Sequence, residues 1–542
     1  MSVAFRRLSL VRQSGQALGA PCGDREARLS MSEQYLMALD AGTGAGRCFL
    51  IDTNGRKAFS AYREWGQIEV EDLAPLGRAF DAAYYWKCLA EAAREAMSKG
   101  NVKPEQVIAV SSTSQREGAV FLDQGGQVLY AGPNQDARAL VEGMGLASEF
   151  GQRAYEVSGH YLNLIFVPAR LLWHKNNAPE VYERIAHVLM INDWMLYQLC
   201  GEIACEPTNA SETAVYNLRS GDWDRQLIAD IGLPQEIFPP VRPGGYLLGQ
   251  VSARAAEETG LKAGTPVIVG AADTQCGVIG AGAIRDGDIA AVAGTTTPVQ
   301  MVLNEVIIDP QTRLWTGAFI PPGSWVLESN AGATGIIYRW MRDTFCHAEC
   351  VEAQEKDQDP FVIMSAEAAL SPIGANGVQA FLGSNIMDAK NLMGVTSGLI
   401  MNAYSMLSDS QSRYHLLRAQ LEGMAFAIRA NAEQISEVSG RTVTRLFACG
   451  GSTQSALFVN ILANVMNVPV VVPRFREGTA LGAAICAGVG AGSYGDFEQG
   501  MHALAQPERT VEPVRDDASQ YEGHYRQWMR TRQVLAQVPS LF

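Results

Sequence analysis

Two segments of the chain share one pattern, an apolar run followed by a turn of glycine and threonine and then a second apolar run. The first copy spans residues 36–52, with its turn at Gly42-Thr43-Gly44. The second spans residues 288–303, with its turn at Gly294-Thr295-Thr296. Two short apolar runs around such a turn are typical of a β-hairpin, so we predict one hairpin in each half. The repeat indicates two related half-molecules that hold one ligand between them.

The two turns carry chemistry suited to phosphate. Glycine lets a ligand approach the backbone closely, and backbone N–H groups and threonine hydroxyls can donate to phosphate oxygens. A single turn of this kind is most often only structural. In this chain a third turn, Gly450-Gly451-Ser452, follows a predicted strand at 445–449. Together, in this order, they favour a polyphosphate ligand.

Between these turns, apolar residues alternate between helical spacing and short strand-like runs. Such alternation is typical of α/β layers. The pattern predicts helices at 79–99, 168–175, 191–196, 414–438 and 455–466, and strands at 107–112, 119–123, 265–270 and 469–473. A stretch of small residues at 478–484 permits close approach by a flat ligand or by a neighbouring helix.

Polar residues follow two of the predicted strands. Asp273 stands just after the strand at 265–270, and a carboxylate at a strand end faces a cleft more often than a core. The loop Ser114-Gln115-Arg116-Glu117-Gly118 places an arginine donor beside a carboxylate acceptor, which suits vicinal hydroxyls. A solvated Arg–Glu pair on a loop explains the same residues equally well.

Composition narrows the class of ligand. Of the 542 residues, 47% are hydrophobic and 18% are charged. A chain of this length is too long for one core, so we expect two domains. The formal net charge of -14 argues against a nucleic-acid partner, because binding to a phosphate backbone needs a basic face. No uninterrupted apolar run reaches the ~18 residues of a membrane span. We therefore expect a small-molecule partner and no membrane partner.

The ten cysteines form no CxxC pair, which is typical of reduced thiols and predicts a cytoplasmic protein. Residues 1–30 hold five arginines and two acidic residues but no secretory apolar core. We expect this leader to be disordered, and Met31 rather than Met1 to be the start of translation.

Four motifs together resemble those of the FGGY carbohydrate kinase family of the actin/hexokinase superfamily. They are Asp40-Ala41-Gly42-Thr43, Gly270-Ala271-Ala272-Asp273, Gly294-Thr295-Thr296 and Gly450-Gly451-Ser452. The resemblance implies an α/β fold of two ribonuclease-H-like domains around a central cleft. It places substrate binding and the catalytic aspartate in residues 31–285 and nucleotide binding in residues 286–542.

The same resemblance implies roles for single residues. Asp273 acts as general base on the substrate hydroxyl, and Asp40 holds Mg²⁺ largely through water. The residues implied to bind ATP are Gly42, Thr43, Gly44, Arg47, Gly294, Thr295, Thr296, Gly450, Gly451 and Ser452. Those implied to bind substrate are Gln115, Arg116, Glu117, Asp136, Asp273 and Thr274. One departure is that Ala45-Gly46 precede Arg47 where relatives usually carry a hydroxyl side chain, which removes one phosphate contact.

For the substrate, three segments are similar to the autoinducer-2 kinase subgroup of the family. They are Asn134–Ala139, Pro168–Trp173 and Ile191–Trp194. The resemblance implies ATP-dependent phosphorylation of the terminal hydroxyl of the linear autoinducer-2 precursor, a hydrated pentanedione. A pentulose, erythritol or glycerol substrate stays open, as does a homodimeric assembly. An alternative from another class is an actin-like ATPase switch, although such a switch has no need of the polar loop at Arg116.

Overall fold

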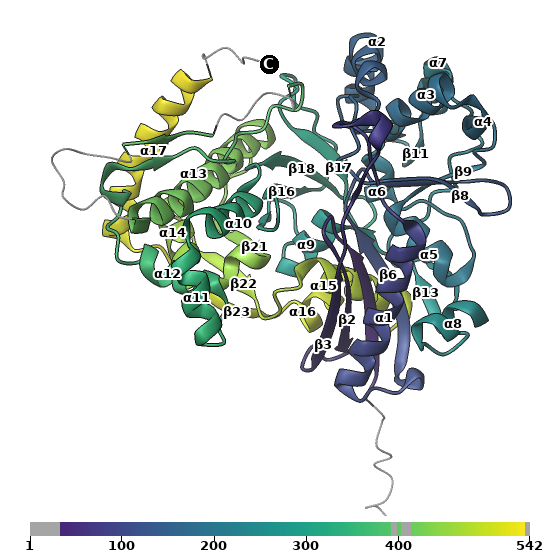
Figure 1. Cartoon of the computed structure of the whole chain (residues 1–542), viewed down its shortest axis with the longest axis horizontal. Coiled ribbons are helices and arrows are strands. Elements are labelled where there is room, and N and C mark those ends of the chain that lie inside the picture. The colour runs from purple at the N-terminus through teal and green to yellow at the C-terminus, as the bar shows by residue number, and fades with distance from the viewer. Residues whose placement is uncertain (1–32, 392–397, 403–412, 537–542) are drawn as a thin grey trace, which may run out of the picture. The chain divides into compact units, whose positions relative to one another are not determined.

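The computed structural model of the protein describes residues 33–391, 398–402 and 413–536 (Figure 1). The predicted leader at 1–30 lies outside the described residues. Both predicted hairpins are confirmed. Strand β1 (Tyr35–Ala41) pairs antiparallel with β2 (Ala45–Asp52), and β15 (Ile289–Val292) pairs antiparallel with β16 (Pro298–Leu303).

Each hairpin belongs to a larger sheet, and the two sheets share one plan. The first runs in the order β12-β13-β6-β1-β2-β3, and the second in the order β17-β18-β16-β15-β21-β22-β23. In both, the first hairpin strand is parallel to a strand on its other side, namely β6 to β1 and β21 to β15. Both sheets also end on an antiparallel strand, β12 or β23. The two halves therefore repeat a unit of structure, as the repeated turn predicted.

Ten further strands complete the two sheets, and four of them, β6, β13, β21 and β22, match predicted apolar runs. The ten are β3 (Ala58–Glu64), β6 (Val107–Ser114), β12 (Leu247–Gln250), β13 (Pro266–Ile268), β14 (Ala271–Ala272, which pairs with β6), β17 (Trp315–Ala318), β18 (Trp325–Asn330), β21 (Leu446–Cys449), β22 (Val470–Pro473) and β23 (Pro507–Val511).

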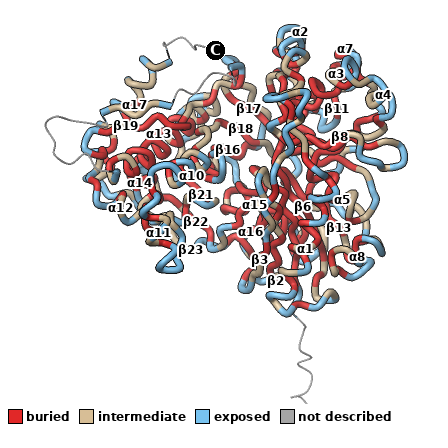
Figure 2. The backbone as a smooth tube through the Cα atoms, viewed as in Figure 1, coloured by how far each residue is buried: buried red, intermediate tan, exposed pale blue. Residues whose placement is uncertain are grey.

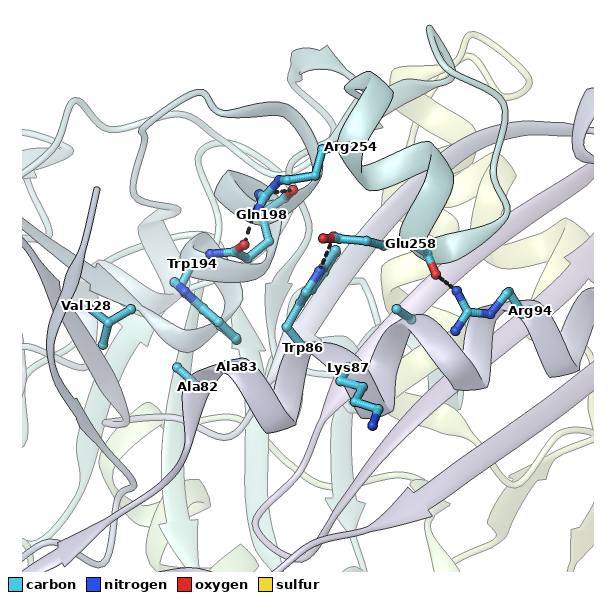
Figure 3. A pocket seen from close by; sticks show the side chains of 11 residues that line it. Ala82, Ala83, Trp86, Lys87, Arg94, Val128, Trp194, Gln198, Arg254 and Glu258 are labelled. Carbon is cyan, nitrogen blue, oxygen red and sulfur yellow. Dashed lines mark hydrogen bonds between the residues drawn. The ribbon is translucent and has the colours of Figure 1, made fainter. Parts of the chain in front are cut away.

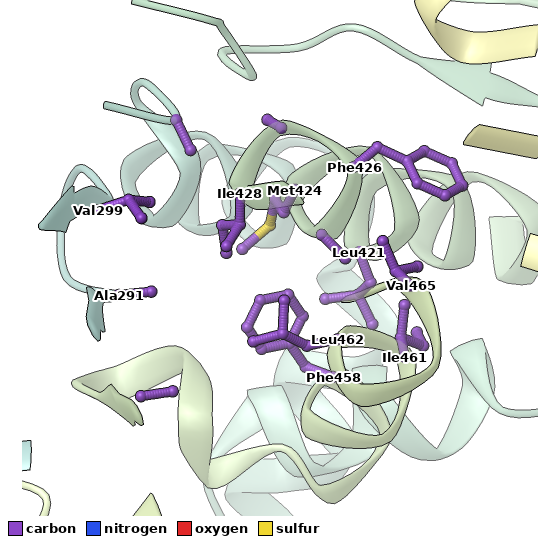
Figure 4. Packing of buried hydrophobic residues seen from close by; sticks show 14 of the residues in the cluster. Ala291, Val299, Leu421, Met424, Phe426, Ile428, Phe458, Ile461, Leu462 and Val465 are labelled. Carbon is purple, nitrogen blue, oxygen red and sulfur yellow. The ribbon is translucent and has the colours of Figure 1, made fainter. Parts of the chain in front are cut away.

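Each sheet has its own apolar core. The helices α1 (Ala82–Gly100), α5 (Ile191–Cys200) and α8 (Ala253–Thr259) contribute to the core of the first sheet. The helices α13 (Arg413–Ser439), α14 (Ala456–Met466) and α17 (Arg515–Leu535) contribute to that of the second. Figure 4 shows side chains of α13 and α14 near those of the second hairpin, and Figure 2 shows that the central strands of both sheets, such as β6 and β16, are largely buried.

A third apolar core joins the two halves, and two helices, α9 (Asp273–Ala281) and α15 (Gly478–Gly490), meet in it. Helix α15 belongs to the second half yet packs on β1 and β6 of the first sheet, and on α9. The small residues let these helices meet closely, because a Cβ on Gly482 would lie 2.2 Å from the Cys276 carbonyl oxygen. Gly478 is buried against Cys449. Close approach by a neighbouring helix is therefore confirmed at Gly482, whereas Gly478 packs on strand β21, and a flat ligand beside this stretch stays a prediction.

The first half also carries an inserted layer with its own apolar cluster. It contains β7 (Ala119–Leu122), β8 (Val128–Gly132), β9 (His187–Met190), α2 (Leu140–Ser158), α3 (Val167–Asn177), α6 (Pro207–Ser211) and α7 (Arg225–Ile231). The remaining elements are short or peripheral. They are β4 (Ile68–Glu69), β5 (Arg78–Ala79), α4 (Pro179–Tyr182), β10 (Tyr216–Asn217), β11 (Asp222–Trp223), α10 (Thr334–Phe345), α11 (His347–Glu355), α12 (Pro360–Ala368), β19 (Gln379–Ala380), β20 (Ile400–Met401) and α16 (Phe497–Leu504). Among the described residues, no helix combines the length and the apolar character that crossing a membrane requires.

Candidate active site

Three parallel strands of the first sheet end side by side. Ala41 of β1 and Ala272 of β14 are both in register with Ser114 of β6. The next residues, Gly42, Gln115 and Asp273, therefore leave the sheet at one edge. The carboxyl ends of parallel strands are where α/β proteins bind their ligands. The predicted phosphate turn, substrate loop and catalytic aspartate are thus brought together by strand register.

Asp40, the implied metal ligand, lies one residue before the end of β1 and is 7% exposed. It is held from both halves of the chain. Thr479 at the start of α15 donates its hydroxyl to Oδ2 at 2.9 Å, and the Arg47 guanidinium lies 3.8 Å from the same oxygen. Burial raises the pKa of Asp40, whereas Arg47 and Thr479 oppose that shift. Thr479 had no signal in the sequence, because its partner lies at the other end of the chain.

Asp273 is the first residue of α9 and is half-buried. The Thr274 hydroxyl donates to its Oδ1 at 3.2 Å. Burial raises the pKa of Asp273 to about 7; the Arg116 charge opposes this shift and the Asp40 carboxylate adds to it. A carboxylate that titrates near neutrality is suited to general base catalysis at the pH of a cell. The geometry is therefore consistent with the role implied for Asp273.

The residues around Asp40 and Asp273 fit a hard divalent cation. The two carboxylates are close enough for the charge of one to raise the pKa of the other, and a cation relieves such repulsion. Mg²⁺ prefers one or two carboxylates together with water and phosphate oxygens. Asp40, the predicted metal residue, can supply such a carboxylate.

The second half presents its turns at the corresponding edge of its own sheet. Val292 of β15 is in register with Cys449 of β21, so Gly294-Thr295-Thr296 and Gly450-Gly451-Ser452 leave the sheet together. Gly294, Thr295 and Thr296 are exposed. At Gly450 the backbone φ is 100°, and a Cβ there would lie 2.5 Å from the Ala293 carbonyl oxygen, so only glycine fits this turn.

Open space faces several of these glycines. A Cβ on Gly44 or Gly451 would meet no atom within 4 Å, and one on Gly294 would meet only the Thr296 carbonyl oxygen, at 3.8 Å. In the first turn, Gly42 and Thr43 are half-buried and Gly44 is exposed. The N–H groups of Gly42 and Gly294 donate to carbonyl oxygens within their own turns, so the donors left for phosphate oxygens are the N–H groups of the residues that follow them and the threonine hydroxyls. Both turns therefore fit the phosphate groups of ATP.

Arg116 is the largest departure from the sequence-based interpretation, because it is buried rather than solvated. Its Nη1 donates to Glu212 at 2.9 Å and to Glu328 at 2.7 Å, and its Nη2 donates to Glu328 at 2.8 Å. All three side chains are at most 8% exposed. The solvated-pair alternative is therefore wrong.

A tryptophan and a histidine also border this ion cluster of Arg116, Glu212 and Glu328. The Trp315 ring lies 5.7 Å from the Arg116 guanidinium carbon, and His160 Nε2 lies 3.2 Å from Glu212. Burial raises the pKa of Glu212, but the Arg116 charge and His160 overcome it and bring the value to about 2. Glu212 therefore remains ionised at neutral pH.

Glu117 and Gln115 stand on either side of Arg116, and each has polar side-chain atoms that can bind a ligand. Glu117 is buried and has a φ of 59°, an uncommon backbone conformation for a residue with a side chain. Burial raises the pKa of Glu117 well above its usual range, with Arg116 opposing and Glu212 adding to the shift. The Nε2 of Gln115 is buried without a hydrogen-bond partner in the described chain. Strained backbone and orphaned donors of this kind are typical of ligand sites.

Asp136, also predicted to bind substrate, is placed differently. It is fully buried, and its carboxylate accepts hydrogen bonds from Tyr130 at 2.6 Å, from Arg138 at 2.7 Å and from the Arg78 N–H at 2.9 Å. Both carboxylate oxygens thus have partners within the chain. These contacts give Asp136 a structural role, and substrate contact by this residue stays a prediction.

A separate cavity of about 420 Å³ lies between α1, α5 and α8 (Figure 3). Trp86 donates its Nε1 to Glu258 at 2.6 Å, and Arg254 donates to Gln198 at 3.0 Å on its rim. None of the predicted site residues lines this cavity. We therefore assign it no part in the reaction.

Comparison with known proteins agrees with this arrangement. The N-terminal domain of the FGGY family of carbohydrate kinases matches residues 35–280, and the C-terminal domain of that family matches residues 289–491. The chain is 35% identical over 498 residues to the autoinducer-2 kinase of Klebsiella pneumoniae, an alignment that covers 91% of this chain and 93% of that protein.

Solved structures show the same fold. A ligand-bound xylulose kinase from Lactobacillus acidophilus has a TM-score of 0.79 at 22% identity, covering 93% of this chain and 99% of that one. A xylulose kinase from Rhodospirillum rubrum has a TM-score of 0.77 at 26% identity, with coverages of 93% and 99%. FGGY kinases use ATP as phosphate donor, generally with a divalent metal. The chain belongs to the FGGY family of carbohydrate kinases and is an ATP-dependent sugar kinase.

Proposed function

We propose that this chain transfers the γ-phosphoryl group of ATP to the terminal hydroxyl of the linear autoinducer-2 precursor. The observation that carries the proposal is the 35% identity to autoinducer-2 kinases over nearly the whole chain, which includes the loop at Arg116 and the strand end at Asp273. The site provides hydrogen-bond donors and carboxylate acceptors for a small molecule with several hydroxyl groups.

In this mechanism each residue has one task. Asp273 accepts the proton of the acceptor hydroxyl as its oxygen attacks the γ-phosphorus, and the bond to the β,γ-bridging oxygen breaks to release ADP. Glu117 and the free donors of Arg116 orient the acceptor. Positioning and charge stabilisation supply most of the rate in phosphoryl transfer, so the oriented acceptor is as important as the base.

The phosphate groups of ATP would be held by backbone and hydroxyl donors of both turns. Thr43 would contribute from the first half, and Thr295, Thr296 and Ser452 from the second. Asp40 would hold Mg²⁺ largely through water, and the cation would neutralise charge on the phosphate oxygens. We propose residues 31–285 as the substrate domain and residues 286–542 as the nucleotide domain.

A second candidate is a polyol kinase of glycerol type, which the Arg116-Glu117 pair favours because it presents a donor and an acceptor to adjacent hydroxyls. ADP release measured with the autoinducer-2 precursor, D-xylulose, erythritol, glycerol and no acceptor separates these functions. We expect the highest kcat/KM for the precursor. A higher value for another acceptor would reassign the substrate, and equal ADP release without any acceptor would favour an ATPase switch.

A further inference from the structure

The contacts of Arg116 point to a determinant of acceptor charge that lies in the opposite half of the chain. We infer that Glu328 fixes the position of Arg116 and, as a second carboxylate beside Glu212, makes the ion cluster net negative, and thereby restricts the acceptor site to uncharged hydroxyl compounds. The inference rests on the proposed function, because it concerns the acceptor of the same reaction. It assigns a specificity-determining and positioning role to a residue outside the substrate loop.

Glu328 reaches Arg116 across the two halves. It lies on β18 of the second sheet, is 2% exposed, and accepts from both terminal nitrogens of Arg116, at 2.7 and 2.8 Å. Gln300 of β16 donates to the same carboxylate and so fixes its orientation. A bidentate pair of this kind defines the plane and direction of a guanidinium group. The second half therefore determines where the substrate arginine points.

The remaining donors of Arg116 are few. A guanidinium group has five N–H donors. Glu212 and Glu328 accept three of them, which leaves two for an acceptor molecule. Two N–H donors are enough to bind hydroxyl or carbonyl oxygens. The guanidinium group stays charged, but Glu212 and Glu328 outnumber it, so the three side chains together carry a net negative charge.

The other cations near the substrate loop are also unavailable. Arg170 is fully buried and donates to the Tyr130 hydroxyl and to main-chain carbonyls, one of them that of Glu117. Arg138 is paired with Asp136 at 2.7 Å. Of the described arginines that contact the substrate loop or Asp136, none is left unpaired beside Glu117 and Asp273 for a carboxylate on the acceptor. Leaving a charge unpaired in a buried site is costly, so the site selects against sugar acids.

Kinetics on wild-type protein and three variants test this inference, with the autoinducer-2 precursor as neutral acceptor and D-gluconate as acidic acceptor. For the wild type we expect a kcat/KM at least 100-fold lower for gluconate. Glu328→Gln removes the second carboxylate and with it the excess negative charge, so we expect KM for the precursor to rise at least tenfold, KM for ATP to stay within twofold, and the preference over gluconate to shrink at least tenfold.

Glu328→Asp separates position from charge. It keeps the carboxylate but shortens it, so KM for the precursor should rise while gluconate is still rejected. Glu437→Gln is the matched control, because Glu437 is an exposed carboxylate that pairs with Arg313 in the same half, at 3.3 Å. Its kinetics should match the wild type. Thermal unfolding of each variant shows whether it is folded.

The outcomes distinguish this inference from the proposed function. If the wild type uses gluconate as well as the precursor, or if Glu328→Gln leaves both KM for the precursor and the preference unchanged, the inference is wrong and the kinase function stands. If Glu328→Gln does not fold, wild-type discrimination and Glu328→Asp decide the question. If the wild type phosphorylates no acceptor in the wider panel, the proposed function fails and this inference with it.

Discussion

At the scale of single residues, the site depends on carboxylates whose surroundings differ. Asp273 is partly desolvated and lies near a second carboxylate, and its pKa is raised to about 7. Glu212 is more deeply buried, yet its pKa is about 2 because Arg116 and His160 stabilise the charged form. The first environment produces a base that can exchange a proton near neutrality. The second produces a permanent charge that holds an arginine.

A pH profile tests the assignment of the base. Because the pKa of Asp273 is raised, its carboxyl group is protonated below about pH 7 and cannot accept the proton of the acceptor hydroxyl. We expect kcat/KM to rise about tenfold from pH 6 to pH 7.5 and then to level off. Affinity for ATP measured over the same range is the control and should change less. A flat profile down to pH 5 would exclude titration of Asp273 as the source of the activity.

At the scale of elements, local patterns predicted most of the two sheets. The hairpins, β6, β21, α13 and α14 appear close to their predicted bounds, because each has a clear apolar run or helical period. The helix α9 was not predicted, since its sequence from Asp273 to Ala281 contains two glycines and has no polar face. Its burial between the halves, rather than its own propensity, stabilises it.

Within the candidate site, the sequence predicted the residues that follow strands but not their partners from distant parts of the chain. The turns and Asp273 have local signals, because glycine, threonine and aspartate stand directly after strands. Glu212, Glu328 and Thr479 were missed. Their partners lie far away in sequence, at Arg116 and Asp40, and a single sequence does not reveal such pairs. Glu328 leaves one weak signal, an acidic residue within the apolar strand β18.

The contact of α9 with α15 yields a prediction on stability. Gly482→Ala would place a Cβ 2.2 Å from the Cys276 carbonyl oxygen and 2.5 Å from its Cα, so the helices must separate. Overpacking of this kind typically lowers the free energy of unfolding by about 1–3 kcal/mol. Denaturant unfolding measures the change.

Gly523→Ala is the control for this effect. Gly523 lies within α17, is exposed, and has no atom within 4 Å of its Cβ position. Alanine there should raise stability, by up to about 1 kcal/mol, because it favours the helix more than glycine does. If both variants change stability equally, close packing of α9 on α15 is not what makes Gly482 necessary.

At the scale of the whole molecule, the two halves share structure as well as a site. Leu36 and Ala38 of β1 lie in one apolar cluster with Ala480 and Ala484 of α15. The first sheet is therefore covered on one face by a helix from the second half. The ion pair from Arg116 to Glu328 joins the halves again, next to the proposed acceptor.

This exchange of a helix predicts that the first half is not stable alone. A fragment of residues 34–288 lacks α15 and exposes the apolar face of β1 and β6, so we expect it to aggregate or to bind a hydrophobic dye. Co-expression with residues 289–536 should restore a soluble complex. A fragment that unfolds cooperatively by itself and binds no dye would show that the halves are independent.

The most direct measurement of the central claim is phosphoryl transfer by Asp273→Asn. Asparagine keeps the size of the side chain but cannot accept the proton, so ADP formation with the autoinducer-2 precursor should fall at least a hundredfold, as the loss of a general base typically does. ATP affinity by calorimetry should stay within a few-fold of wild type, and Asp343→Asn, an exposed control, should retain full activity. Turnover of Asp273→Asn near the wild-type rate would contradict the account, because it would remove Asp273 from the reaction.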